Sequence, residues 1–258
     1  MNAVFLAALW FGHAVFGLLE WICEVWELLQ GLWTAGWLGP GPPADAKVLR
    51  ASVPRMRKLP AHVAVVLADE RVSVRDLVRF VEWCFLSNIP YVSFYDRYGV
   101  AERNELTIRK EFAQSRPDLV KHTEWITRKP FRSKKNGISD TLNHNSDEKR
   151  VHVRILSNSD GKGAIVSLTR ILAEAATAGM IQTEDINTKL INEKLDLCGL
   201  PNPDMAIVCG NTLCTYGLLP WHIPTTEFFL LPVHRDLSVD RFVGLLEKYA
   251  TSEQRYGK

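Results

Sequence analysis

The sequence HVAVVL at His62–Leu67 decides the fold. Five of its six residues are aliphatic and show no polar alternation, which predicts a strand buried on both faces. Ser73 follows as an N-cap for a helix with apolar positions at 77, 78, 80, 81, 84 and 85. Asn88-Ile89-Pro90 ends that helix, residues 91–95 (YVSFY) form a second strand, and another helix covers about 102–114. This order predicts an α/β fold with a largely parallel central sheet covered by helices on both faces.

The same alternation continues to the end of the chain. It predicts strands over 151–156, 204–209 and 226–231, and helices over about 163–178 and 184–197, the second capped by Thr183. Ser238 caps the last helix, whose buried face comprises Val239, Phe242, Val243, Leu245, Leu246, Tyr249 and Ala250. We therefore place one domain at residues 59–258. Its polar stretch at about 116–150 predicts a flexible insertion, with a basic run at 128–135 that is either a solvated loop or a contact for anionic lipid.

The first 46 residues form a different kind of segment. They contain four acids and no Lys or Arg, so all 31 basic residues follow against the other 25 acids and the later part carries +6, although the whole chain carries only +2. Residues 3–19 are apolar except for His13, and a helix over about 3–23 is just long enough to cross a bilayer. We expect a membrane anchor at 1–38, with its span at about 3–23, and a linker at 39–58.

Other interpretations of this segment stay open. A cleaved signal peptide competes with a retained anchor, but the segment lacks a basic start and a small-residue cleavage site. Because Glu20, Glu24 and Glu27 share one helical face, the segment also fits an interfacial amphipathic helix. Basic residues begin only at Lys47, which predicts a cytosolic C-terminal domain by the positive-inside rule. Five cysteines without a CxxC pair agree with a reducing compartment.

Recognisable chemistry is scarce in the C-terminal domain. Its sequence contains no P-loop, no strand-borne GxGxxG, no HExxH and no nucleophile elbow, and its composition speaks against a nucleic-acid binder. Four blocks are more specific: LPAHVAVVLADE at 59–70, IPYVSFYD at 89–96, LLPWHIPTTE at 218–227 and YATSEQRYGK at 249–258.

In this order and spacing, the four blocks resemble the cis-prenyltransferases, and within them the Nogo-B receptor group of noncatalytic subunits of the dehydrodolichyl diphosphate synthase complex. The resemblance implies a domain at the endoplasmic reticulum membrane that pairs with a catalytic cis-prenyltransferase subunit in a heterodimer. That complex makes the long polyprenyl diphosphate precursor of dolichol, which serves protein glycosylation. Mg²⁺ and isopentenyl diphosphate would then bind mainly through the catalytic partner.

The departures from the enzyme pattern lie at three positions. Catalytic members end the first strand in a motif whose Asp holds magnesium and the allylic diphosphate, and Ala68 occupies that position here. A methyl group cannot bind a hard cation, and Asp69 is one residue out of phase along the strand. Catalytic members also carry two diphosphate-gripping arginines before Trp221, where this chain has Val208 and Cys214. We therefore expect no self-contained catalytic site and no metal site.

The C-terminal sequence Arg255-Tyr256-Gly257 matches the family's R-x-G motif. In the family this tail crosses the dimer interface and completes the partner's isopentenyl diphosphate site, so the resemblance assigns diphosphate binding to Arg255 and Gly257. An arginine fork and an unobstructed glycine backbone both suit a diphosphate. An isolated R-x-G would be a solvated terminus, and only its matching context favours the functional interpretation.

Other polar and aromatic residues receive structural interpretations. We expect Trp221 to pack in the core or at a dimer interface, and His222 and His62 to be hydrogen-bonded structural histidines. Asp96 and Arg97 follow the second strand at the ligand-binding edge of α/β sheets, although charges at strand ends are usually solvated.

Two functional hypotheses follow. The first is an anchored, noncatalytic subunit that activates a partner prenyltransferase. The second is a membrane receptor or scaffold whose domain only binds proteins, with the domain on the outer side of the membrane. A self-sufficient homodimeric enzyme is disfavoured by Ala68, Val208 and Cys214 together.

Overall fold

The computed structural model describes residues 10–15, 17–18, 42–68, 72–127, 149–232 and 234–253. The chain divides into two compact units, Met1–Asp45 and Ala46–Lys258. In the first unit, residues 10–15 and 17–18 are helical, and the rest of the expected anchor at 1–38 lies outside the described residues. Within the described residues, no helix is both long and apolar enough to span a bilayer.

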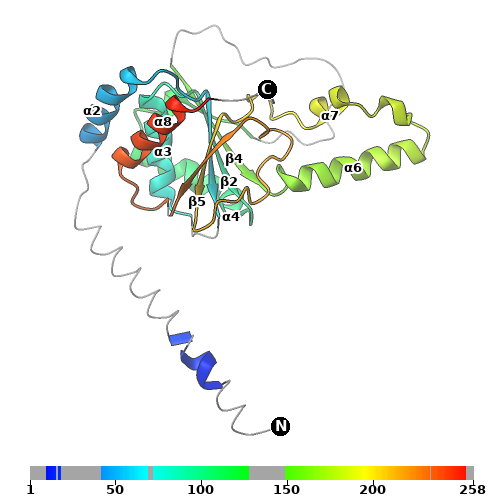
Figure 1. Cartoon of the computed structure of the whole chain (residues 1–258), viewed down its shortest axis with the longest axis horizontal. Coiled ribbons are helices and arrows are strands. Elements are labelled where there is room, and N and C mark those ends of the chain that lie inside the picture. Colours follow the sequence, from blue (N-terminus) through cyan, green and yellow to red (C-terminus); the bar gives the residue numbers. More distant parts are fainter. Residues whose placement is uncertain are drawn as a thin grey trace. The chain divides into compact units, whose positions relative to one another are not determined.

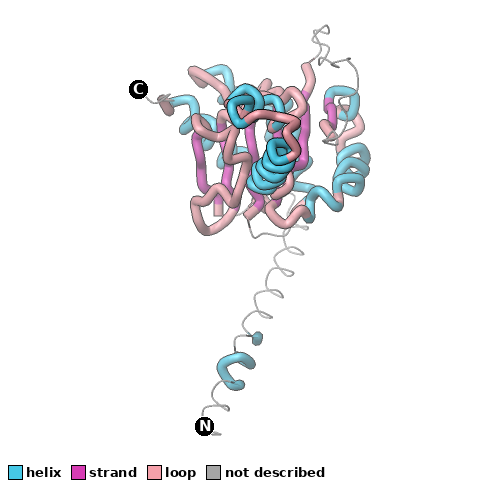
Figure 2. The backbone as a smooth tube through the Cα atoms, turned by 90° about the vertical axis from the view of Figure 1, so that its right-hand side faces the viewer, coloured by secondary structure: helices cyan, strands magenta, loops and turns pink. Residues whose placement is uncertain are grey.

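The second unit is built on a six-stranded sheet in which every paired strand is parallel, in the order β3-β4-β2-β1-β5-β6. Figure 2 shows strands of this sheet side by side, with helices around them. The predicted parallel α/β architecture is therefore confirmed. The strands are β1 (His62–Leu67), β2 (Tyr91–Asp96), β3 (Thr123–Trp125), β4 (Val151–Ser157), β5 (Met205–Cys209) and β6 (Glu227–Leu231). All six residues of β1 are buried, as its aliphatic sequence requires for a central strand.

The helices occupy the intervals between the strands and the two ends of the domain (Figure 1). They are α2 (Pro42–Ser52), η1 (Val53–Arg55), α3 (Val74–Leu86), α4 (Val100–Arg103), α5 (Glu105–Ser115), η2 (Val120–His122), α6 (Lys162–Thr177), η3 (Thr183–Asp185), α7 (Thr188–Lys194) and α8 (Val239–Thr251). The predicted helix over about 102–114 is thus two helices, because the chain breaks at Asn104.

The caps agree only partly with expectation. Ser238 caps α8 by accepting a hydrogen bond from the Arg241 amide. Ser73 does stand at the N-cap of α3, but its hydroxyl donates to the Asp76 carboxylate and makes no cap bond to the backbone. The expected cap at Thr183 is wrong for the longer helix: Thr183 opens the short η3, and Asn187 caps α7.

The two faces of the sheet differ in their cover. A larger core joins residues such as Val63, Val65 and Leu67 of β1 to α3, α5 and α8. A smaller core contains Ala64 and Val66 from the opposite face of β1. In the described part of the chain its cover comes from non-helical segments through Leu197, Leu200, Leu218 and Leu219, so the prediction of helices over both faces is wrong for this side.

Two regions expected to lack structure contain elements. The expected linker at 39–58 carries α2 and η1, and Leu49 of α2 is fully buried in the larger core. The first part of the expected insertion at 116–150 carries η2 and the edge strand β3, whose Trp125 packs edge-to-face on Phe112 of α5. These few apolar side chains are enough to hold short elements against the core. The basic run at 128–135 lies outside the described residues.

Candidate functional site

The carboxyl edge of the parallel sheet is where α/β proteins bind ligands. The strand registers bring the ends of four strands together there, because Leu67 pairs with both Asp96 and Cys209, and Asp96 pairs with Ser157. Ala68 and Gly210 immediately follow two of these strands. The edge is therefore the place to test for a catalytic site.

Ala68 and Val208 lie on neighbouring chain segments at this edge: Ala68 directly follows β1, and Val208 belongs to β5 and to the smaller core. Ala68 is 2% exposed and its amide donates to the Cys209 carbonyl at 3.2 Å. Val208 is fully buried and is paired with Val66 on the neighbouring strand. Methyl and isopropyl groups offer no oxygen to a cation and no donor to a phosphate. The two residues that replace catalytic side chains of the enzymes, Ala68 and Val208, are thus both buried and apolar.

Gly210 has no room for a side chain of its own beside Ala68. A Cβ built on Gly210 would stand only 2.9 Å from the Ala68 Cβ, and 3.6 Å from the hydroxyl of Tyr216. The backbone of the loop after β5 therefore approaches the end of β1 as closely as a glycine permits. In contrast, Cys214 in the same loop is exposed, and its sulfur accepts a hydrogen bond from the Tyr216 amide.

The loop after β5 is also held against the loop after β4. The Tyr95 hydroxyl donates to the Tyr216 carbonyl at 3.0 Å, and the Lys162 amide donates to the Gly217 carbonyl at 3.1 Å. A Cβ on Gly161 would stand 2.2 Å from that same carbonyl oxygen. Burial raises the pKa of Tyr95 to about 12, so this hydroxyl stays a donor at neutral pH. Direct protein contacts thus close this side of the edge.

Asp96 is a structural carboxylate, although we expected a solvated charge. It is 4% exposed, and its two oxygens accept hydrogen bonds from the amides of Tyr98 and Ala101 at 2.9 Å each. These bonds fix the turn through Gly99, which has a left-handed φ of 68°, at the start of α4. Arg97 lies with its guanidinium 5.7 Å from the Tyr98 ring.

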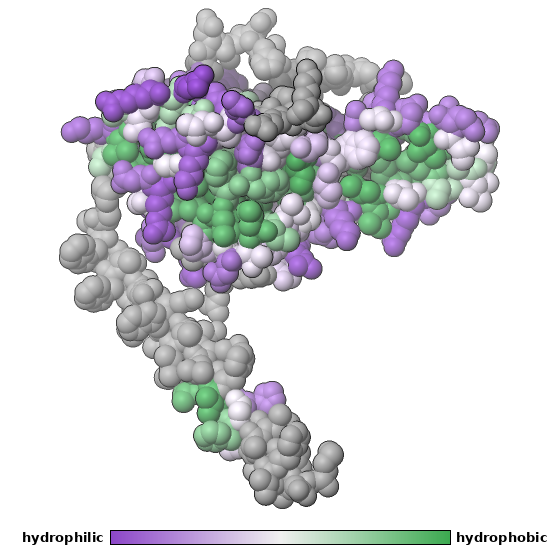
Figure 3. Space-filling view, viewed as in Figure 1, coloured by the Kyte–Doolittle hydropathy of each residue, from purple (hydrophilic) through white to green (hydrophobic). Residues whose placement is uncertain are grey.

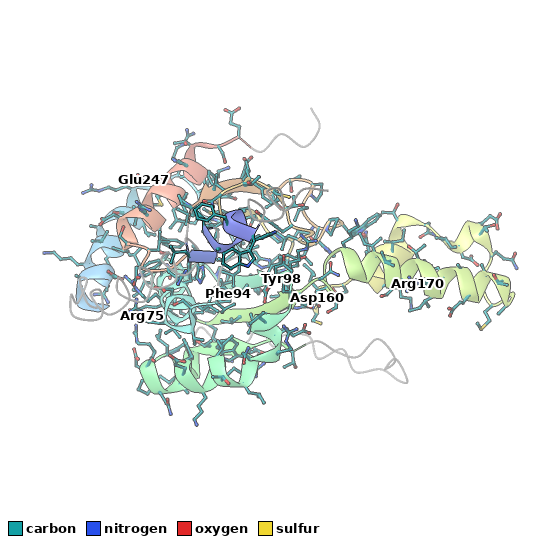
Figure 4. The ribbon with its side chains drawn as sticks, turned by 90° about the horizontal axis from the view of Figure 1, so that it is seen from below. Arg75, Phe94, Tyr98, Asp160, Arg170 and Glu247 are labelled. Carbon is teal, nitrogen blue, oxygen red and sulfur yellow. The ribbon has the colours of Figure 1, made fainter. Side chains whose placement is uncertain are left out.

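A buried ion pair at the end of β4 was not predicted. The Arg154 guanidinium donates to the Asp160 carboxylate at 3.0 Å and to the Leu197 carbonyl at 2.5 Å. Asp160 also accepts from the Ser157 amide at 3.1 Å, and both charged side chains are about 5% exposed or less. Figure 4 shows Asp160 and Tyr98 on the body of the domain. The signal that could have revealed the pair is an arginine inside the apolar strand sequence VHVRILS.

The predicted structural histidine at position 62 is confirmed. The fully buried His62 donates from Nδ1 to the Pro201 carbonyl at 2.7 Å and accepts at Nε2 from the Ser93 hydroxyl at 2.8 Å. Because the carbonyl can only accept, Nδ1 carries a proton, and the neutral ring then accepts at Nε2. Burial lowers the pKa of His62 to about 4.

His222 and Trp221 lie near α7 rather than at the edge that holds Ala68. Burial lowers the pKa of His222, in keeping with a structural role. Trp221 is 36% exposed and its indole donates to Asn192 of α7 at 2.7 Å, so it is not a core residue. Glu227 opens the edge strand β6, where its amide donates to the Asp204 carbonyl.

The remaining sequence candidates lie outside the described residues: Asp69, Glu70, Arg255 and Gly257. Among the residues that are described, no group of three or more His, Cys, Asp or Glu side chains could hold a metal ion. At the described end of β1, Ala68 does not fit a magnesium ion, because its methyl group offers no oxygen ligand, and the nearby Val208 of β5 offers no donor to a diphosphate.

Comparisons with known proteins agree with this description. No family model matches the chain. The lavandulyl diphosphate synthase of Lavandula x intermedia shares its fold, with a TM-score of 0.55 at 17% identity over 78% of this chain and 99% of that one. The dehydrodolichyl diphosphate synthase complex subunit nus1 of Schizosaccharomyces pombe is 25% identical over 98% of this chain and 97% of its own length.

The mouse dehydrodolichyl diphosphate synthase complex subunit Nus1 is more similar in sequence. It is 31% identical over 211 residues, which cover 81% of this chain and 69% of the mouse protein. Because this similarity runs across most of both chains, the chain belongs to the Nus1 family of dehydrodolichyl diphosphate synthase complex subunits.

Proposed function

We propose that this chain is the noncatalytic, activating subunit of a heteromeric cis-prenyltransferase. Its complex would make the long-chain polyprenyl diphosphate from which dolichol is formed for protein glycosylation. The observation that carries the proposal is the apolar contact of Ala68 with Gly210, beside the buried Val208, at the edge where a prenyltransferase needs a carboxylate and arginines. Such an edge cannot stabilise the charge of a departing diphosphate, so a partner must do so.

In this proposal the partner performs the condensation. The partner holds most of the Mg²⁺ contacts, and the metal together with arginines neutralises the diphosphate as it leaves the allylic substrate. This chain supplies Arg255 and Gly257 to the partner's isopentenyl diphosphate site. The guanidinium fork of Arg255 binds phosphate oxygens, and Gly257 lets the backbone approach them.

The described end of α8 supports a role for the tail, because it fixes where the tail begins. The Thr251 hydroxyl donates to the Lys248 carbonyl at 2.9 Å, and the Ser252 hydroxyl donates to the Tyr249 carbonyl at 2.9 Å. Tyr249 is 3% exposed within the larger core. These contacts hold the last turn of the helix, so the tail would start from a rigid point.

Helix α6 offers a surface for the catalytic partner. Leu168 is the one buried residue of this 16-residue helix, and α6 extends away from the sheet (Figure 1). Val166 and Ile171 are 43% and 41% exposed, and Met180 just beyond the helix is 72% exposed. Figure 3 shows apolar residues on the surface of α6 and the segment that follows it, which we call the arm. Exposed apolar side chains gathered on one element favour a protein interface.

The proposal also places the protein at the endoplasmic reticulum membrane, with residues 59–258 in the cytosol. The charge distribution supports this orientation, since the first 46 residues carry no Lys or Arg. Protease treatment of sealed microsomes tests it, because a cytosolic domain is digested without detergent. Protection of the domain until detergent is added would favour the receptor topology instead.

The decisive experiment purifies the full chain from membranes and measures prenyl transfer with and without a catalytic cis-prenyltransferase subunit. We expect equal amounts of that subunit to co-purify, no elongation by this chain alone, and activity once the two are combined. Arg255→Ala should reduce the activity of the complex much more than its assembly, whereas Lys110→Ala on exposed α5 is the matched loss of a cation and should change neither. Prenyl transfer by the isolated chain would rule out the proposal.

A further inference from the structure

A dense group of cations begins where the base-free stretch ends. Residues 46–58 contain five basic residues and no acid, and Lys149 joins them from the start of β4. We call these six residues the basic patch: Lys47, Arg50, Arg55, Arg57, Lys58 and Lys149. Lys58 is half-buried and the other five are exposed. All six belong to the second compact unit.

The basic patch is built on firmly packed elements. Leu49 fixes α2 in the larger core, which also contains Tyr249 of α8 and, at its margin, Phe85 of α3. The Lys58 ammonium lies 4.7 Å from the centre of the Tyr249 ring, and the Lys149 ammonium lies 4.6 Å from the centre of the Phe85 ring. Figure 1 shows α2, α3 and α8 side by side, and the packing of their side chains in or against the larger core agrees with that view. The cations are therefore presented by a rigid surface.

The charges of the patch are crowded. The pKa of Lys149 is lowered by partial burial and by the nearby charge of Arg50. Like charges held together repel each other, and this repulsion is relieved when anions approach. The cations come from α2, from η1 and the residues after it, and from Lys149 just before β4. Folding has thus brought together, from distant parts of the sequence, a surface that attracts several negative charges at once.

We infer that the basic patch binds the anionic headgroups of a lipid bilayer. The position of the patch in the sequence selects a bilayer over other polyanions. Its first cation, Lys47, directly follows a stretch with five of the chain's eight tryptophans and no basic residue, a composition that favours membrane contact. Polybasic surfaces next to such segments are attracted to anionic leaflets. This inference does not depend on the proposed prenyltransferase role.

The test measures lysine reactivity in the full chain reconstituted into vesicles of phosphatidylcholine alone or with phosphatidylserine. A water-soluble acylating reagent modifies exposed amines, and mass spectrometry gives the rate at each lysine. We expect acylation of Lys47 and Lys149 to be about fivefold slower on the anionic vesicles, and this protection to fall at high salt. Lys189 and Lys194 on exposed α7 are the internal controls and should react equally on both. Equal rates at Lys47 and Lys149 on the two vesicles would overturn the inference.

Reversing the charge of two patch residues tests whether the basic patch itself causes the protection. The variant Lys47→Glu/Arg50→Glu changes exposed residues of α2 and should abolish the protection of Lys149, while the matched variant Lys189→Glu/Lys194→Glu should leave it intact. Loss of protection in both variants would overturn a specific role for the patch. So would protection of Lys149 by inorganic phosphate on neutral vesicles to the same degree, because the ligand would then be a soluble anion.

Discussion

Gly210 is the residue on which the closed edge of the sheet depends. Because a Cβ there would stand 2.9 Å from the Ala68 Cβ, Gly210→Ala must push apart two fully packed strands. We expect this variant to lower the free energy of unfolding by about 2 kcal/mol, the usual effect of overpacking. Chemical denaturation of the full chain measures it.

Gly244 in the middle of α8 provides the control for that substitution. A Cβ on Gly244 would meet no atom within 4 Å, so Gly244→Ala should raise the free energy of unfolding by about 0.5–1 kcal/mol through better helix propensity. If Gly210→Ala were as stable as Gly244→Ala, the close approach at Ala68 would be wrong.

His62 gives the domain a pH dependence. Its pKa is about 4 in the folded chain and near 6.5 when unfolded, so the folded state favours the neutral ring. The stabilisation is complete above pH 6.5 and is lost as the pH falls towards 4, by about 3 kcal/mol in total. Unfolding measured between pH 7 and pH 4 should show this loss, and His62→Gln should remove most of the difference. A wild-type profile as flat as that of His62→Gln would contradict it.

At the scale of single residues, the sequence predicted which catalytic side chains are replaced better than it predicted the contacts that each residue makes. The losses at Ala68 and Val208 followed from matching the family's motifs, and the structure buries both side chains. The Arg154 pair with Asp160 and the approach of Gly210 depend on loops that meet only after folding. An arginine inside an apolar strand indicates that a buried partner exists, but the local pattern does not identify that partner.

Among the elements, α3 and the C-terminal end of α5 are connected by a charged contact. Glu82 of α3 is 5% exposed and pairs with Arg116, which also binds Asp118 at 2.8 Å just before η2. Arg116→Ala leaves the Glu82 carboxylate buried without its partner. We expect the free energy of unfolding to fall by about 3 kcal/mol, because a buried charge then lacks compensation.

An exposed pair on the same helix α3 is the control. Arg75 pairs with Asp236, but their side chains are 58% and 48% exposed, so Arg75→Ala should cost about 1 kcal/mol or less. The double variant Glu82→Leu/Arg116→Met should recover most of the stability lost in Arg116→Ala. A cost for Arg116→Ala no larger than that for Arg75→Ala would show that the Glu82 contact is not a buried one.

Elements whose sequence has a strong apolar periodicity were predictable, and elements with few apolar residues were not. The strands β1, β2, β4, β5 and β6 and the helices α3, α6 and α8 all match expected ranges closely. The short β3 and α2 have few apolar residues and exist because Trp125 and Leu49 find partners in the larger core. Tertiary packing, which no local pattern reports, decides such elements.

For the whole molecule, α6 is the element that extends away from the sheet, and it has only one buried residue. Figure 4 places Arg170 far out on this helix, away from the sheet. The neighbouring side chain, Ile171, is 41% exposed. Exposing an isoleucine to water does not stabilise an isolated domain, so the exposure favours a contact with another protein. If α6 contacts the catalytic partner, Ile171→Glu should weaken the complex at least tenfold, because a carboxylate would be desolvated there without a partner.

Leu106→Glu on α5 is the matched substitution, since Leu106 is 83% exposed on a different helix. Both changes place glutamate at an exposed helical position, where it is a good helix former, so the isolated chain should stay folded in each case. Co-purification with a catalytic cis-prenyltransferase subunit and titration by surface plasmon resonance should show a loss for Ile171→Glu alone. Equal binding by the two variants would place the partner on another face of the domain.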